Sequence, residues 1–190
     1  IAIEEHGIPG FTLMRRAARA AFDRLLAKWP VPGKIIVFCG TGNNGGDGYV
    51  MASLARQQGV AVEVIQLGKR DSLSGDALQA RQLAEMDGVI MHEFSPSLVL
   101  ERGVIVDAML GTGLGGEGRG DYVAAIQWLN NSGLPVLAVD IPSGLCSDTG
   151  RVMGVAVKAQ QTVSFIGLKQ GLLTGAGPAY TGELYYDSLS

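Results

Sequence analysis

The sequence predicts an α/β protein, a three-layer α/β/α sandwich around a mostly parallel sheet. Short runs of apolar and β-branched residues recur along the chain, as is typical of strands that are buried on both faces. Segments with helical spacing separate these runs, and glycine-rich turns follow several of them. Strands that alternate with helices in this way are joined by right-handed crossovers, so we expect an open sheet with helices on both sides.

The first half of the chain begins with a helix and then alternates. Residues 12–28 place Leu13, Ala17 and Leu25 at helical spacing with charged residues between them, and two prolines follow. Residues 34–39 (KIIVFC) form an apolar run typical of a buried strand. The same reasoning predicts a helix at 49–58, a strand at 61–67, a helix at 75–86 and a strand at 89–92.

The second half continues the alternation and then changes character. Strands are predicted at 104–108 and 135–139, with a helix at 122–131 between them. Two late strands, 162–166 and 183–186, are joined by a glycine-rich stretch without a helix of normal length, so we expect them to extend one edge of the sheet. The predicted fold is therefore Rossmann-like, and in such sheets ligands bind beyond the carboxyl ends of the strands.

Length and composition narrow the function classes. The 190 residues, 47% of them hydrophobic, suffice for one domain, and a net charge of −3 supplies no strong positive field, so we do not expect nucleic acid as a partner. No run of 18 apolar residues occurs, so no membrane span is expected. Cys39 and Cys146 lie far apart and outside any metal-binding pattern, and we expect both to be reduced in a cytoplasmic protein.

A glycine-rich loop is predicted at 40–48, directly between a strand and a helix. It contains a GxGxxG pattern, in which glycines let the backbone approach a phosphate and the helix N-terminus supplies N–H donors. Asn43, Asn44 and Asp47 within it resemble a ligand cradle, although the same residue types also form turns and helix caps. The dinucleotide fingerprint also requires an acid at the end of the second strand, and Glu63 falls mid-strand, which disfavours an NAD(P)-dependent oxidoreductase.

Two further polar turns follow buried strands. Asp107 stands at the tip of the strand at 104–108 and begins a second glycine cluster, which can form an anion nest or a surface loop capped by an aspartate. Asp140 and Ser143 flank Pro142 after the strand at 135–139, in a turn that is either functional or purely structural. All three turns belong to the same edge of one sheet, so their polar residues should converge.

The converging side chains favour a particular kind of ion. Asp107, Asn44 and Ser143 offer only oxygen ligands with one formal charge. Such a set is poor for zinc and transition metals and better suited to a weakly held hard cation, including an alkali cation.

Three long motifs carry a family resemblance. They read GTGNNGGDGYVMA at 40–52, DAMLGTGLGG at 107–116 and DIPSGLCSDTG at 140–150. In this order and spacing they resemble the NAD(P)H-hydrate epimerase family, also called the YjeF N-terminal domain. The resemblance covers nearly the whole chain, so we expect residues 1–190 to form one such domain. The segments at 4–17 and 162–172 are also similar, particularly to bacterial forms in which an ADP-dependent hydrate dehydratase domain follows.

The resemblance implies a substrate and a reaction. The substrate is a nicotinamide dinucleotide hydrated at C6 of the reduced ring, NADHX or NADPHX, and the enzyme, an isomerase, interconverts its R and S epimers. Asp140 would contact the ring region, potassium would be bound by Asn44, Asp107 and Ser143, and the protein would be a homodimer. The other positions implied in substrate binding are Asn43, Asn44, Gly45, Gly46, Asp47, Gly111, Thr112, Gly113, Leu114, Gly115, Gly116 and Glu117.

The reaction needs a group that moves a proton. We expect Asp140 to be that acid or base, with Asp107 as the second choice if it does not bind a cation. Lys169 could add positive charge near the substrate or remain a solvated loop residue. Two other functions stay open, a non-catalytic nucleotide- or protein-binding module of the same fold and an NAD(P)-dependent oxidoreductase. Scaffold proteins of mRNA decapping and an apolipoprotein-binding protein share this fold, and we expect such scaffolds to lack the polar loop residues.

Overall fold

The computed structural model describes residues 8–111 and 119–190. Its helices are α2 (Gly10–Lys28), α3 (Asn43–Gln57), α4 (Gly75–Met86), α5 (Arg119–Asn131) and α6 (Gly177–Thr181), with two 3₁₀ turns, η1 (Arg70–Ser72) and η2 (Gln170–Leu172). Its strands are β1 (Ile35–Cys39), β2 (Val62–Gln66), β3 (Ile90–Glu93), β4 (Val104–Ala108), β5 (Val136–Val139), β6 (Gln161–Phe165) and β7 (Glu183–Asp187). The alternation predicted from the sequence is confirmed, with boundaries that differ by one to three residues for most elements.

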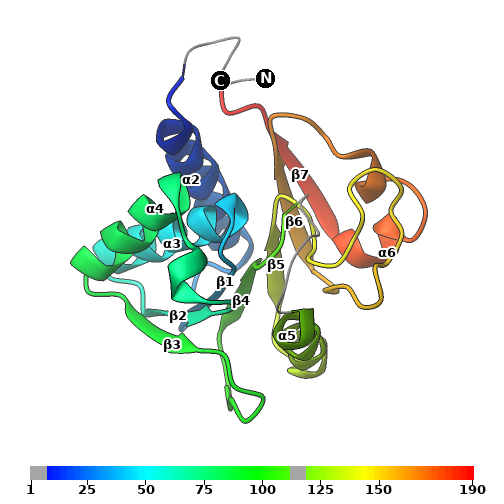
Figure 1. The fold of residues 1–190 in the computed structure, drawn as a ribbon. Helices are drawn as coiled ribbons and strands as arrows, with labels where there is room; N and C mark the ends of the chain where they lie inside the picture. The colour runs from blue at the N-terminus through cyan, green and yellow to red at the C-terminus, as the bar shows by residue number, and fades with distance from the viewer. Residues whose placement is uncertain (1–7, 112–118) are drawn as a thin grey trace.

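The seven strands form one sheet in the order β3-β2-β1-β4-β5-β6-β7 (Figure 1). Every pair of neighbouring strands among them is parallel. The chain builds the sheet outward from β1 to β3, returns to place β4 against the other side of β1, and then continues outward to β7. The strand order therefore reverses between β1 and β4, which is where ligands bind in open α/β sheets.

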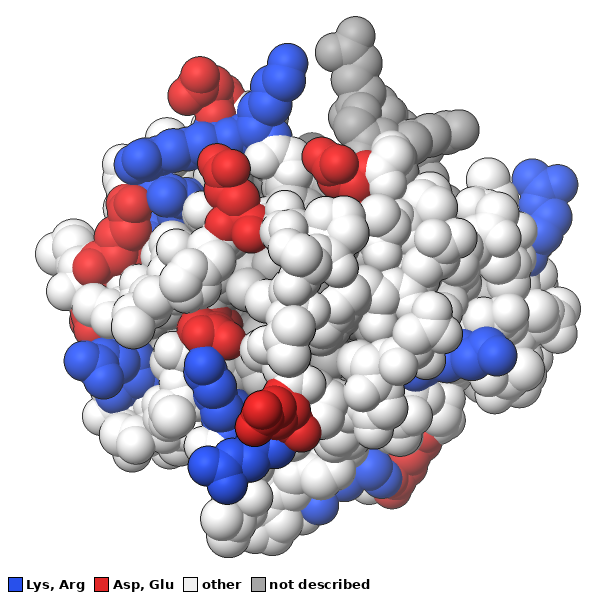
Figure 2. Space-filling view, turned by 90° about the horizontal axis from the view of Figure 1, so that it is seen from below, with Lys and Arg blue, Asp and Glu red and all other residues white. Residues whose placement is uncertain are grey.

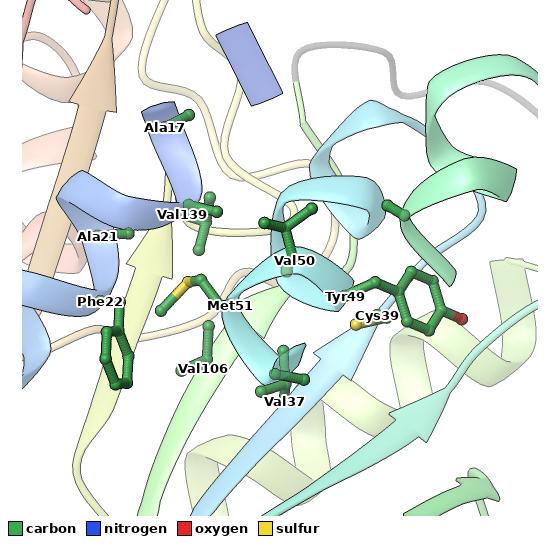
Figure 3. Close-up of a cluster of buried hydrophobic side chains, with 14 of the residues drawn as sticks. Ala17, Ala21, Phe22, Val37, Cys39, Tyr49, Val50, Met51, Val106 and Val139 are labelled. Atoms are coloured by element: carbon green, nitrogen blue, oxygen red, sulfur yellow. The ribbon is translucent and has the colours of Figure 1, made fainter. Parts of the chain in front are cut away.

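Helices cover both faces of the sheet, which confirms the predicted α/β/α sandwich. Helices α2, α3 and α4 lie together on one side of the sheet, and α5 lies on the other (Figure 1). Alternate residues of β1 serve the two cores, because side chains along a strand point to opposite faces. Val37 and Cys39 join the core under α2 and α3, whereas Ile36 and Phe38 join the core under α5. Figure 3 shows Phe22 of α2 and Met51 of α3 above the sheet in the first of these cores.

The late strands extend the sheet as predicted. β6 and β7 lie beyond β5, and the connection between them contains only η2 and the five-residue helix α6. This connection packs with the turns after β5 in a small third core, in which Ile141, Leu145 and Leu172 are buried. The segments that follow β5 and β6 therefore pack against each other, which fixes the relative positions of the two strand ends.

The prediction of an open loop at 40–48 is wrong in one respect, because helix α3 begins at Asn43 rather than Tyr49. The glycines explain the early start, since they let the first helical turns lie directly on the sheet. A Cβ on Gly45 would collide with the carbonyl oxygen of Gly40. A Cβ on Gly48 would lie 2.7 Å from Cβ of Ala108 and 2.8 Å from Sγ of Cys39. Asn43 to Asp47 therefore form the first helical turn and not a separate loop.

Charged residues are mixed on the surface. The face in Figure 2 carries lysines and arginines interspersed with acidic residues, beside a broad uncharged area. Within the described parts of the chain, none of the helices is long and apolar enough to cross a membrane.

Candidate functional site

Polar residues gather where the strand order reverses. Asp107 lies near the end of β4, Asp140 directly follows β5, and three residues separate the end of β1 from the start of α3. Ser143 follows in the turn after Asp140. The structure thus brings the three predicted segments to one edge of the sheet, and the contacts within them divide into two groups.

The first group is centred on Asp107, whose side chain is fully buried. Its Oδ2 accepts a hydrogen bond from the backbone N–H of Ser143 at 2.8 Å, and its Oδ1 accepts one from the Ser143 hydroxyl at 2.6 Å. The backbone N–H of Met109 donates to Oδ1 at 3.3 Å. Leu110 N lies 2.9 Å from the Ser143 hydroxyl oxygen. Asp107 and Ser143, predicted as partners, are in direct contact.

Burial changes the acidity of Asp107. Loss of water around the carboxyl raises its pKa to about 6, against the opposing effect of the hydrogen bonds from Ser143 and Met109. A buried carboxylate whose hydrogen-bond donors are neutral is stabilised further in its ionised form by a nearby positive charge. The electrostatics therefore suit a bound cation.

Asn44 has buried amide atoms that need a partner. The residue is 7% exposed, and neither Oδ1 nor Nδ2 makes a hydrogen bond to any residue that the structure describes. A Cβ on Gly111 would touch the Asn44 side chain at 3.4 Å, so Asn44 lies beside the turn that follows Asp107. Leaving a buried amide unsatisfied costs about 1–3 kcal/mol, so a ligand at this point would relieve a real penalty. The oxygens of Asn44, Asp107 and Ser143 fit a hard cation.

The second group is centred on Asp140, which occupies a strained turn. Its φ is 68°, and the N–H of Ile141 donates to the carbonyl oxygen of Val139 at 2.8 Å, which defines a γ-turn with a left-handed central residue. Ile166 repeats this arrangement after β6, with φ 63° and a bond from Gly167 N to Phe165 O of 2.6 Å. Backbone strain of this kind costs about 1–3 kcal/mol and occurs often at functional sites.

The carboxylate of Asp140 reaches across to the end of β6. Its Oδ1 accepts hydrogen bonds from Phe165 N at 3.2 Å and from the Ser164 hydroxyl at 3.3 Å. Lys169, in the loop after β6, forms an ion pair with the same oxygen, and its Nζ also donates to Phe165 O at 2.9 Å. The side chains of Lys169 and Asp140 are 17% and 19% exposed. Lys169, whose role the sequence left open between a site residue and a solvated loop residue, is a partner of Asp140.

Helix α3 contributes one residue to each group. Asn44 lies on the Asp107 side, and Asp47, three residues later on the same helix face, interacts with Asp140 and Lys169. Burial raises the pKa of Asp47 well above its usual range, Asp140 adds to this increase and Lys169 opposes it. Asn43 begins the helix and is exposed.

The remaining predicted substrate residues divide by position. Gly111 is half-buried beside Asn44, whereas Thr112, Gly113, Leu114, Gly115, Gly116 and Glu117 lie outside the described residues. Gly45 and Gly46, which were predicted to bind substrate, lie in the first part of α3, and each packs against the protein on the side where a Cβ would point. A Cβ on Gly46 would meet Met14 at 2.5 Å, whereas a Cβ on Gly42 would meet nothing within 4 Å.

A small pocket lies apart from these two groups, at the carboxyl ends of β1 to β3. It is lined by Thr41, Tyr49, Gln66, Leu67, Gly68, Lys69, Arg70, Leu73 and Glu93. Gln66 ends β2 and donates to the Tyr49 hydroxyl at 3.0 Å. Glu63 lies mid-strand as predicted and pairs with Lys34 at 2.6 Å, so it supplies no acid at the end of β2.

Sequence reasoning missed the contributions of β6. Ser164 and the backbone N–H of Phe165 hold Asp140, and neither belongs to a polar motif. These contacts could have been predicted from the expected place of the strand at 162–166, beside the strand that Asp140 follows. Side chains at the ends of neighbouring parallel strands meet at one edge of the sheet.

Comparison with known proteins identifies relatives along nearly the whole chain. A bifunctional NAD(P)H-hydrate repair enzyme Nnr of Coxiella burnetii is 48% identical over 185 residues, which are 97% of this chain and 38% of that protein. The similar enzyme of Vibrio cholerae is 46% identical, and this chain again spans 38% of its length. An NAD(P)H-hydrate epimerase of Limosilactobacillus fermentum is 38% identical over 96% of this chain and 87% of that protein.

Fold and family comparisons agree with these relatives. The crystal structure of a yeast protein, ynu0, has the same fold, with a TM-score of 0.75, 22% identity and coverage of 90% of this chain and 76% of that one. Residues 10–171 match the family described as YjeF-related protein N-terminus. The chain therefore belongs to the family of YjeF-related protein N-termini.

Proposed function

We propose that this protein is an NAD(P)H-hydrate epimerase, an isomerase that interconverts the R and S forms of NADHX and NADPHX. The observation that carries the proposal is the pair of polar groups at the switch point of the sheet, in a chain whose relatives bear this name. The Limosilactobacillus epimerase is of particular weight, because this chain covers 87% of it.

In our proposal, Asp140 transfers the protons on oxygen when the hydroxyl at C6 of the hydrated ring is exchanged. C6 carries a hydroxyl and is bonded to the ring nitrogen, so the C6–O bond can break with loss of hydroxide, while the nitrogen lone pair stabilises the cation that remains. Water then adds to the other face and gives a proton to the carboxylate of Asp140, which passes that proton to the departed hydroxide and is ionised again. Ring opening and reclosure is the alternative route: Asp140 takes the proton of the C6 hydroxyl as the C6–N bond breaks to an aldehyde, the ring nitrogen takes up a proton, and both transfers reverse when the ring closes on the other face.

The substrate would lie along the switch point. The N-terminus of α3 offers backbone N–H groups near Gly42 for the phosphates, and the turns at Gly111 and Asp140 would bind the nicotinamide half. Asn43, Asn44 and Asp47 would contribute from the first turn of α3.

Potassium is the proposed cofactor, held by Asn44, Asp107 and Ser143. Support comes from the buried carboxyl of Asp107 and from the amide of Asn44, which makes no hydrogen bond within the described part of the chain. When bound, the ion would supply positive charge that keeps Asp107 ionised and fixes the turn after β4. It takes no part in the proton transfers, which we assign to Asp140.

The setting of the reaction is also proposed. The matched Coxiella and Vibrio enzymes are bifunctional and much longer than this chain, and we propose that the S epimer passes to a dehydratase that removes the added water. A cytoplasmic location and a homodimer remain predictions.

The test is direct. Purified R epimer of NADHX is incubated with the protein, and the S epimer is followed by chromatography against a protein-free control, because the hydrate epimerises slowly by itself. Acceleration above that background is expected. Binding of the hydrate without acceleration would instead favour a non-catalytic module, and hydride transfer to a second substrate would favour an oxidoreductase.

A further inference from the structure

Lys169 is folded back into the site although it lies on a loop. Its side chain is only 17% exposed, and its Nζ contacts both Asp140 Oδ1 and the Phe165 carbonyl oxygen at the end of β6. An ammonium group has three hydrogens to donate, and these contacts use two of them. Burying a lysine to this extent is costly unless the charge is paired, so the pairing with Asp140 is a specific feature of the fold.

The contacts of Asp140 are unequal between its two oxygens. Oδ1 faces three donors, which are Lys169 Nζ, Phe165 N and the Ser164 hydroxyl. Oδ2 accepts no hydrogen bond from any residue in the described ranges. The carboxylate is therefore anchored through one oxygen, and the other is available to a ligand.

From this geometry we infer that Lys169 is the positioning residue of Asp140: it anchors the carboxylate through Oδ1, so that Oδ2 is presented to the substrate. This inference rests on the proposed function for its catalytic meaning, but the ion pair and its effect on the carboxylate do not depend on that function.

Lys169 also acts on a second carboxyl group. Burial raises the pKa of Asp47 on helix α3, the charge of Asp140 raises it further, and the ammonium of Lys169 opposes the increase. The ammonium of Lys169 is the positive group that faces both of them among the described residues. Without it, the two carboxyl groups would face no positive group among the described residues, and Asp140 would lose the charged donor to its Oδ1.

The experiment compares Lys169→Met, Lys169→Arg and Lys158→Met in the complete chain. Methionine removes the charge but keeps a similar length, arginine restores the charge, and Lys158 is an exposed lysine that lies 5.9 Å from the Tyr180 ring, outside the site. The readouts are kcat and KM for R-NADHX from pH 5.5 to 9, together with the ¹³C titration of the aspartate carboxyl signals.

We expect Lys169→Met to lower kcat about 10- to 100-fold with KM changed less than about threefold, because misplacing a catalytic group costs rate more than binding. The acid limb of its rate profile should move up by about one pH unit, since a carboxylate that loses a neighbouring cation is harder to ionise. Lys169→Arg should recover the position of that limb, and Lys158→Met should match the parent protein.

Two results would overturn the inference. One is a Lys169→Met protein with an unshifted profile and unshifted carboxyl titration. The other is equal impairment of Lys169→Met and Lys169→Arg without a pH shift, which would make the lysine structural only. If the parent protein has no epimerase activity, the proposed function fails, and the carboxyl titration alone still decides whether Lys169 controls Asp140.

Discussion

Asp107 and Asp140 leave neighbouring strands, β4 and β5, at the same edge of the sheet, yet their surroundings differ. Asp107 is fully buried, and among the described residues its hydrogen-bond donors are neutral groups of Ser143 and Met109. Asp140 is partly exposed and has the ammonium of Lys169 against one oxygen. Within the described ranges, Asp107 has no positive neighbour, whereas Asp140 has the ammonium of Lys169.

The difference separates two tasks that carboxylates perform. A buried carboxylate with neutral donors gains from an added cation, which suits Asp107 to ion binding. A carboxylate that is already paired and still has one oxygen available suits proton transfer, which fits Asp140. Two similar residues thus receive different roles from their environments, as in other enzymes that use two carboxylates.

The largest expected effect comes from Asp140→Asn. Asparagine tolerates the left-handed backbone of this position but cannot exchange the proton usefully. Epimerisation should slow about 10²- to 10⁴-fold with the fold intact. Initial rates above the uncatalysed background check this, with Asp148→Asn, an exposed aspartate, as the control. If the variant keeps nearly full activity, Asp107 is the catalytic residue instead. If substrate binding falls as much as the rate does, Asp140 is a substrate ligand only.

The environment of Asp107 should be visible in the pH dependence of stability. Because its pKa is raised to about 6 in the fold, the native state holds this proton to higher pH than the unfolded chain. The protonated side chain therefore adds to the free energy of unfolding. This contribution is complete below about pH 4 and is lost as the pH rises through 6, which lowers the free energy of unfolding by about 3 kcal/mol.

Urea unfolding of the parent protein and Asp107→Asn between pH 4 and 7, without potassium, measures this loss. The variant is expected to be less stable at every pH, since its single amide oxygen cannot replace both carboxylate oxygens as acceptors for Ser143. Its free energy of unfolding should not show the decrease between pH 4 and 7 that Asp107 causes in the parent protein. Identical slopes would show that Asp107 titrates normally, and the contrast with Asp140 would disappear.

Helix α3 links the two groups, and its glycines can show where a ligand approaches. Gly45→Val should destabilise the protein by at least about 1–3 kcal/mol, because its side chain would collide with the Gly40 backbone. Gly42→Ala should fold normally, since its φ of −93° is open to any residue and its Cβ meets nothing. It should nevertheless raise KM about tenfold, equivalent to about 1.4 kcal/mol, if phosphates approach the helix there. An unchanged KM would show that the phosphates of the substrate do not bind near Gly42.

The smallest expected effect is that of potassium. Ligand at ten times its Kd stabilises a protein by about 1.4 kcal/mol, or roughly 3–6 °C in Tm for a chain of this size. Potassium should therefore raise Tm more than lithium at equal ionic strength, and Asn44→Ala should abolish the difference. Equal Tm values of the parent protein in the potassium and lithium salts would show that no cation binds at the Asp107 group.

Much of the fold followed from local pattern. The apolar runs at 34–39 and 104–108 and the helical spacing at 12–28 reflect burial, which acts residue by residue along each element. The contact between Asp107 and Ser143 was also foreseen, because strand ends share an edge in a parallel sheet. The early start of α3 was not, because glycine favours loops in isolation and only the nearby sheet explains its use in a helix.

The sequence by itself determined the α/β architecture, the edge at which its polar turns meet and the identity of the residues there. Only the tertiary structure decided how those residues differ, because pairing and burial depend on chains that are distant in sequence. Lys169 reaches Asp140 across 29 positions, and Ser143 reaches Asp107 across 36. Propensity and periodicity carry no information about such contacts, whereas the acidity of each carboxyl group depends on them directly.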